Sequence, residues 1–162
     1  MSARRNGDII LDGVAALLLA ATVLLSFVQV VARYVLLIST PWSEELARLF
    51  FVWAVFLGAA IGVKRNMHLR VDFLFVRLPP RVAGLVLAGM DLLLACMAVI
   101  MVFYGTQLVL STQADFSTSL GYPRNLFYLP VPFSGILMLW YLLPNLARRL
   151  SSGRPTPPGR EA

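Results

Sequence analysis

The residues that could carry proton or metal chemistry are few in this sequence. The chain has one histidine, His68, and one cysteine, Cys96. His68 and Asp72 stand four residues apart, so on a helix they share a face and could form half of a metal site. No other histidine and no thiolate cluster completes that site, and one histidine cannot supply both axial ligands of a bis-histidine haem. We therefore expect a structural His68–Asp72 hydrogen bond, with no metal and no cofactor.

The sequence carries no pattern typical of catalysis either. It shows no Ser–His–Asp arrangement, no glycine-rich phosphate loop and no pair of carboxylates placed for acid–base work. A single cysteine forms neither an internal disulfide nor a thiolate cluster. We expect that the protein is not an enzyme.

The composition indicates which elements must position these side chains. Of the 162 residues, 59% are hydrophobic and 14% charged, and the mean hydropathy is +0.77. Soluble domains are about 45–50% apolar and about 25% charged. A soluble fold of this length could not bury so much apolar surface, and a disordered chain would be far more polar. The chain is therefore expected to be a membrane protein.

The apolar segments predict an all-α membrane protein with four transmembrane helices. The spans are expected at about 10–32, 44–63, 82–110 and 127–147. Over 66–78, apolar residues recur at helical spacing, which predicts an amphipathic helix lying in the membrane interface against lipid. Residues 1–150 would form one membrane domain, and 151–162 a disordered cytoplasmic tail.

The second span is too short unless it includes charged residues. Its charge-free part covers 49–63, which rises only about 23 Å, less than a hydrocarbon core of about 30 Å. The helix must therefore begin earlier and carry Glu44, Glu45 and Arg48 into the interface. Ser43 is the expected N-cap.

The basic residues predict the orientation. If the N-terminus is cytoplasmic, eleven of the fourteen Lys and Arg residues lie on the cytoplasmic side. Such a bias places both termini inside the cell. The net charge of +6 then reflects topology, and no nucleic-acid partner is expected.

One stripe of the second span combines charges with small residues. At 100° per residue, its members share one side of the helix: Glu44, Arg48, Phe51, Val55, Gly58 and Gly62. Small residues let membrane helices approach closely, so this side is expected to face another helix. Two interpretations of the charged end remain open. Glu44 and Arg48 form a surface ion pair, or they contact a partner protein.

Asp91 is expected near mid-membrane, ten residues beyond Arg81. An intramembrane carboxylate is costly unless it is paired, protonated or hydrated. One interpretation is a proton or ion site. The other, which we favour because a transport pathway needs several such groups, is a carboxyl group hydrogen-bonded to Thr22, Ser26 or Ser134.

Two stretches of the first half resemble the DctQ-type small membrane subunit of tripartite ATP-independent periplasmic (TRAP) transporters. They are VQVVARYV at 28–35 and PWSEELARLFFVWAVFLGAAIGVKRNMHLRVDFL at 41–74. The resemblance rests on an ordered set of residues. At these positions and on the small-residue stripe we expect structural and subunit-contact roles for Arg33, Trp42, Glu44, Glu45, Arg48, Trp53, Gly58, Gly62, His68 and Asp72.

The resemblance implies a multi-pass protein of the bacterial inner membrane that pairs with a large DctM-type permease. It implies that a periplasmic solute-binding protein delivers an organic acid, such as a C4-dicarboxylate, and that an ion gradient drives uptake by symport. The small subunit would enlarge the static scaffold of the large one. The helix at 66–78 would brace that scaffold, and Glu44, Glu45 and Arg48 would contact the large subunit or the docked binding protein.

Two alternatives belong to other classes. One is a small membrane-anchor subunit of a redox complex, which the single histidine disfavours. The other is a stand-alone four-helix transporter, which the scarcity of intramembrane polar groups disfavours.

Overall fold

The computed structural model describes residues 2–65, 80–117 and 119–152. Within them the helices are α1 (Ser2–Tyr34), α2 (Pro41–Lys64), α4 (Pro80–Ser111), α5 (Asn125–Tyr128) and α6 (Pro130–Ser152). Four segments are long and apolar enough to cross a membrane: Ile9–Tyr34, Pro41–Lys64, Ala88–Ser111 and Asn125–Pro144. The predicted all-α fold with four spans is confirmed. The side of the membrane on which the termini lie stays a prediction.

Two predicted features fall wholly or mostly outside the described residues. The interfacial helix at 66–78, with His68 and Asp72, lies outside them. Of the predicted tail at 151–162, only the first two residues are described, and they belong to α6. The division into one domain and a tail therefore stays a prediction.

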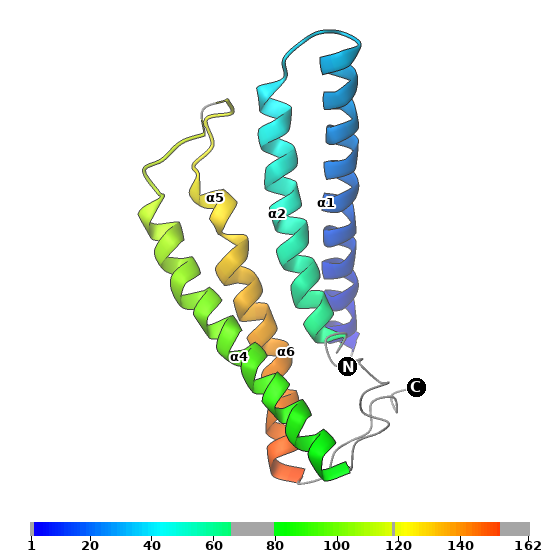
Figure 1. The fold of residues 1–162 in the computed structure, drawn as a ribbon, viewed down its shortest axis with the longest axis vertical. Helices are drawn as coiled ribbons and strands as arrows, with labels where there is room; N and C mark the ends of the chain where they lie inside the picture. Colours follow the sequence, from blue (N-terminus) through cyan, green and yellow to red (C-terminus); the bar gives the residue numbers. More distant parts are fainter. Residues whose placement is uncertain (1, 66–79, 118, 153–162) are drawn as a thin grey trace.

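The helices pack as two hairpins that lie side by side, and their order across the molecule is α1, α2, α6, α4 (Figure 1). The inner helices α2 and α6 bury the largest share of their spans, and the edge helices α1 and α4 bury the least. Such a row has two broad faces, which must meet lipid or a partner. The connections 35–40 and 112–124 lie at one end, here called the loop end. The other, near Lys64 and Pro80, is called the terminal end.

The start of α2 differs from the prediction. The helix begins at Pro41, with Thr40 as its N-cap. Proline suits this first position because its missing N–H has no helical partner there. Ser43 is therefore not the N-cap. It is fully buried in the first turn, where its hydroxyl donates to the Thr40 carbonyl at 2.8 Å.

The core lies where α2, α4 and α6 meet, toward the terminal end. Its buried members are small or flexible apolar residues: Ala60, Val63, Ala98, Met138 and Leu142. Two glycines allow α4 and α6 to approach closely. A Cβ added at Gly135 would lie 2.9 Å from the Ala98 carbonyl oxygen, and one added at Gly105 would lie 2.8 Å from Cδ of Pro132. These distances are too short for a real Cβ, so glycine is required at both positions.

Candidate subunit interface

The predicted stripe of α2 lies on the surface along most of the span. We name its exposed members the α2 stripe: Glu44, Arg48, Phe51, Val55 and Gly58. The Phe51 and Val55 side chains are 51% and 49% exposed, while the residues that α2 buries lie on its other sides. Gly62, the last member of the predicted stripe, is half-buried. The α2 stripe therefore lies on one broad face of the row, between its neighbours α1 and α6.

The charged end of the α2 stripe forms no ion pair with another described residue. Glu44 and Arg48 are both exposed, and the ion pairs within the described part of the chain involve other residues. The surface pair considered from the sequence is therefore not formed. These two charges are available to a group outside the described residues.

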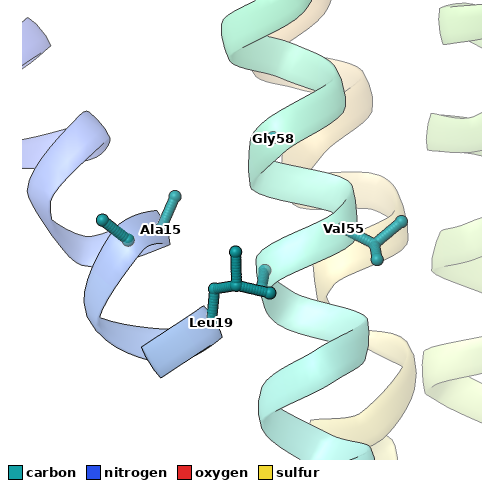
Figure 2. A pocket seen from close by; sticks show the side chains of 6 residues that line it. Ala15, Leu19, Val55 and Gly58 are labelled. Atoms are coloured by element: carbon teal, nitrogen blue, oxygen red, sulfur yellow. The ribbon is translucent and has the colours of Figure 1, made fainter. Parts of the chain in front are cut away.

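A shallow apolar groove of about 340 Å³ adjoins the α2 stripe between α1 and α2. It is lined by small or aliphatic residues of both helices: Ala15, Ala16, Leu19, Ala54, Val55 and Gly58. Figure 2 shows Ala15 and Leu19 on α1, with the Leu19 side chain extending toward α2, and Val55 and Gly58 on α2. A Cβ added at Gly58 would meet nothing within 4 Å. Among the described helices, none fills the space beside Gly58, although the sequence predicted a helix there.

The connection 112–124 lies close enough to the loop end of α2 for charges of α2 to act on Tyr122. The connection turns back on itself: the Ser117 N–H donates to the Tyr122 carbonyl and the Arg124 N–H to the Asp115 carbonyl, both at 2.8 Å. Gly121 supplies the positive φ of +67° that this turn requires. Glu45, beside Glu44 in the chain, acts electrostatically on Tyr122. The two adjacent acids thus have different surroundings.

The phenol of Tyr122 is expected to lose its proton at a higher pH than an unperturbed tyrosine. Burial, and then the negative charge of Glu45, raise the pKa of its phenol above 10.0, against the smaller opposing effects of Arg48 and Arg124. The stability linked to this shift is fully present below pH 10 and is lost as the pH rises through the folded-state pKa. The difference in absorbance at 295 nm between wild type and Tyr122→Phe should therefore show a step above pH 10. A step below pH 10 would contradict this placement.

Trp53 makes an internal contact between α2 and α5. Its indole N–H donates to the Leu126 carbonyl at 3.2 Å, and its ring packs against Phe133 with centroids 6.1 Å apart. In a continuous helix, residue 130 would donate to that carbonyl, but Pro130 has no N–H. Trp53 thus supplies a donor that the proline cannot. Because Trp53 makes both of these contacts with residues of its own chain, they support a structural role for this side chain.

An ion-pair cluster that the sequence reasoning missed joins α1 to α2 at the terminal end. Asp12 Oδ2 lies 2.8 Å from Arg65 Nη2, and Asp12 Oδ1 lies 3.9 Å from Lys64 Nζ. Lys64 also lies 6.0 Å from the ring centroid of Tyr141 on α6. The signal was present in the sequence, because an acid at the start of one span faces bases at the end of its antiparallel neighbour. Lys64 and Arg65 were used only to predict the orientation of the chain in the membrane.

Asp91 is buried on α4, with 2% of its surface exposed. The hydroxyls proposed as its partners bond elsewhere. Thr22 and Ser26 of α1 donate to the carbonyls of Leu18 and Thr22, each at 2.8 Å. Ser134 of α6 donates to the Val131 carbonyl at 3.0 Å. Each of these hydroxyls thus donates to a carbonyl of its own helix, and the hydrogen-bond partner of Asp91 stays a prediction.

The role of Asp91 can be tested by transport. If its carboxyl group is structural, Asp91→Asn keeps the shape and hydrogen-bonding capacity, and uptake by a transporter of the kind that the resemblance implies should stay within about twofold of wild type. Initial rates measured at several concentrations of the coupling ion check this. A change in the ion dependence of uptake, with normal assembly, would instead indicate an ion site.

The remaining predicted positions lie at the loop end. Arg33 is exposed at the end of α1, and Trp42 is exposed in the first turn of α2. The side chains of Val35 to Ile38 between them are also exposed and apolar, which suits a segment at a membrane surface. Within the described residues, no group of His, Cys, Asp or Glu side chains is arranged to hold a metal ion.

Known sequences place the chain in a family. The sequence model of the family described as the DctQ component of tripartite ATP-independent periplasmic transporters matches residues 22–152. A putative TRAP transporter small permease protein of Haemophilus influenzae is 32% identical over 80% of both chains. The sialic acid TRAP transporter small permease protein SiaQ of Vibrio cholerae is 30% identical over 80% of this chain and 75% of its own length.

A longer relative contains the same unit within a larger chain. The isethionate TRAP transporter permease protein DctMQ of Oleidesulfovibrio alaskensis is 32% identical over 65% of this chain, and the match spans 17% of that protein. The match over most of the chain, together with the four apolar helices, decides the assignment. This multi-pass membrane protein belongs to the DctQ family and is a TRAP transporter small permease subunit, a transporter component and not an enzyme.

Proposed function

We propose that this chain is the scaffold subunit of a secondary transporter of the bacterial inner membrane, working with a large DctM-type permease. A periplasmic binding protein would deliver the substrate, and an ion gradient would drive its uptake by symport. The observation that carries this proposal is the exposed α2 stripe of a four-helix row that belongs to a permease family. A chain of this design is suited to packing against a larger membrane protein.

The proposed substrate class is an organic acid. Relatives are named for isethionate, sialic acid and C4-dicarboxylates, and each of these compounds carries an acidic group. A C4-dicarboxylate is one candidate for this transporter among others. We place substrate selection in the binding protein and the large permease, because the exposed groove of this chain is apolar.

Reconstitution into vesicles tests the proposed function. The chain alone, the large permease of its transporter alone, and both together are each supplied with binding protein, labelled organic acid and an ion gradient. We expect uptake only with both subunits and only with the gradient. Uptake by this chain alone would favour the stand-alone alternative. A haem signal in a reduced-minus-oxidised spectrum of the purified chain would favour the redox-anchor alternative.

We propose that the loop end faces the periplasm, where Glu44, Glu45 and Arg48 would contact the large permease or the docked binding protein. The positive bias of the other segments supports this orientation. A cysteine introduced at Leu37, in a chain with Cys96→Ser, should react with an impermeant maleimide added to intact spheroplasts. Labelling only after lysis would reverse the proposed topology.

A further inference from the structure

We propose that a transmembrane helix of the large permease lies along the α2 stripe, with a bulky apolar side chain in the adjoining groove and a carboxylate opposite Arg48. This inference rests on the proposed function and adds to it the face of contact and the chemistry of the contacting helix. The groove residues of α2 lie six to ten residues beyond Arg48, so the two features of the partner helix would be about 9–15 Å apart along its axis.

The depth of Arg48 is the first support for a protein partner. The 24 residues of α2 rise about 36 Å, which exceeds a hydrocarbon core of about 30 Å. Arg48 follows Pro41 by seven residues, so its Cα lies about 7 Å inside the edge of a centred core. A charge that faces lipid at this depth is unfavourable. Because the exposed Arg48 has no ion pair within the described chain, a carboxylate on the partner would offset that cost.

The groove is the second support. Its volume of about 340 Å³ exceeds the cavity of about 150 Å³ that holds a benzene ring, so it can accept a leucine or phenylalanine side chain. Helices in membranes associate where small residues let their backbones approach. At Gly58 the backbone is exposed and the space above it is open. The groove and Arg48 lie along one line of one helix, as contact with a single partner helix requires.

The outer surface of α4 differs from the α2 stripe in its charge and in the size of its side chains. Its exposed residues over the middle of the span are large and uncharged: Leu92, Leu93, Met97, Val99 and Ile100. Such a surface is suited to lipid. Cys96 is exposed on the same helix, so it provides a natural reference position away from the α2 stripe.

The partner is identified by the longer relative. In the isethionate permease protein of Oleidesulfovibrio alaskensis, the matched unit makes up 17% of one continuous chain. That architecture keeps the unit in the same membrane as the remaining permease in equal numbers. A helix of a large permease is therefore the occupant that we assign to the α2 stripe.

Site-directed crosslinking tests the face of contact. In a chain with Cys96→Ser, Val55→Cys is labelled with benzophenone maleimide within the complex and irradiated, and the chain with Cys96 alone is treated identically. We expect an adduct with the large permease from position 55 and little from position 96. If the complex co-purifies but adducts form only from position 96, the inference is wrong while the proposed function stands. If no complex forms, both fail.

Two matched glycine variants separate assembly from folding. Gly58→Leu would fill the groove, whereas Gly89→Leu adds the same side chain to α4, where an added Cβ also meets nothing within 4 Å. We expect Gly58→Leu to reduce the co-purified large permease at least about tenfold, equivalent to about 1.4 kcal/mol, and Gly89→Leu to leave it unchanged. The isolated chains should unfold alike. Equal recovery of both complexes would overturn the inference.

A charge variant tests the role of Arg48 separately. Arg48→Gln keeps a long polar side chain but cannot pair with a carboxylate as a cation. We expect it to reduce recovery of the complex, and the conservative Arg48→Lys to restore part of it. If Arg48→Gln assembles as wild type does, the side chain only reaches toward the headgroups, and the proposed carboxylate contact is wrong.

Discussion

Replacing Gly135 with leucine is expected to lower the free energy of unfolding by about 3 kcal/mol or more, because overpacking at a close backbone contact forces helices apart. An added Cβ there would lie 2.9 Å from both the Ala98 carbonyl oxygen and a methyl carbon of Val102. The carbonyl belongs to the α4 backbone and cannot turn away as a side chain can. Titration with SDS from a mild detergent, followed by circular dichroism, measures the change.

Gly89→Leu is the matched control for this variant. Both substitutions add the same side chain to a spanning helix and the same gain in helix propensity, up to about 1 kcal/mol. Of these two glycines, only Gly135 lies at short range from another helix. If the two variants were equally stable, α4 and α6 would not approach each other as closely as the structure shows.

Trp53→Phe is expected to lower the free energy of unfolding by about 0.5–1.5 kcal/mol, the net contribution of one intramolecular hydrogen bond. The phenyl ring retains much of the packing against Phe133 but cannot donate to the Leu126 carbonyl. Near a membrane, that carbonyl has few other donors, because Pro130 supplies none. The same SDS titration measures the loss.

Trp140→Phe provides the reference, since Trp140 is 68% exposed and is not part of the α2–α5 contact. It should change stability by less than about 0.5 kcal/mol. A second variant, Pro130→Ala, restores a backbone N–H at residue 130. In that background the effect of Trp53→Phe should shrink. An undiminished effect would show that the indole hydrogen bond does not replace the missing N–H.

The four spans were predictable from the sequence because their length and apolar composition are set by the bilayer and need no knowledge of neighbours. The order of the helices across the molecule was not predictable in this way. It depends on which side chains interlock, and this is not encoded in any single segment. The position of Ser43 illustrates the limit at a helix end. Serine is a common N-cap, yet Thr40 and Pro41 set the start of the helix three residues earlier.

The glycines show why the pattern of small residues was only partly informative. Gly58 was singled out because it falls four residues before another glycine, but within the described chain nothing packs on it. Gly105 and Gly135, which have no such spacing between them, make the close contacts. A pattern within one helix reports that a close approach is possible. It does not report which helix, or which protein, makes that approach.

The polar contacts likewise divide into those that the sequence could predict and those that depend on how the helices pack. The pairing of Asp12 with Arg65 joins the adjacent ends of two antiparallel spans, so it could have been found from the sequence. The bond from Trp53 to Leu126 joins residues 73 positions apart, and the hydroxyls of Thr22 and Ser134 turned to their own helices. Such choices depend on the distances that packing sets.

We propose that this chain works as a small subunit attached to a large permease through the α2 stripe, with one copy of each. Native mass spectrometry tests it most directly, on material purified through a tag on this chain after co-expression with the large permease of its transporter. The predicted result is a complex with one copy of each subunit, which dissociates when Gly58→Leu is introduced. Recovery of the chain only as a monomer, or only with copies of itself, would contradict the account.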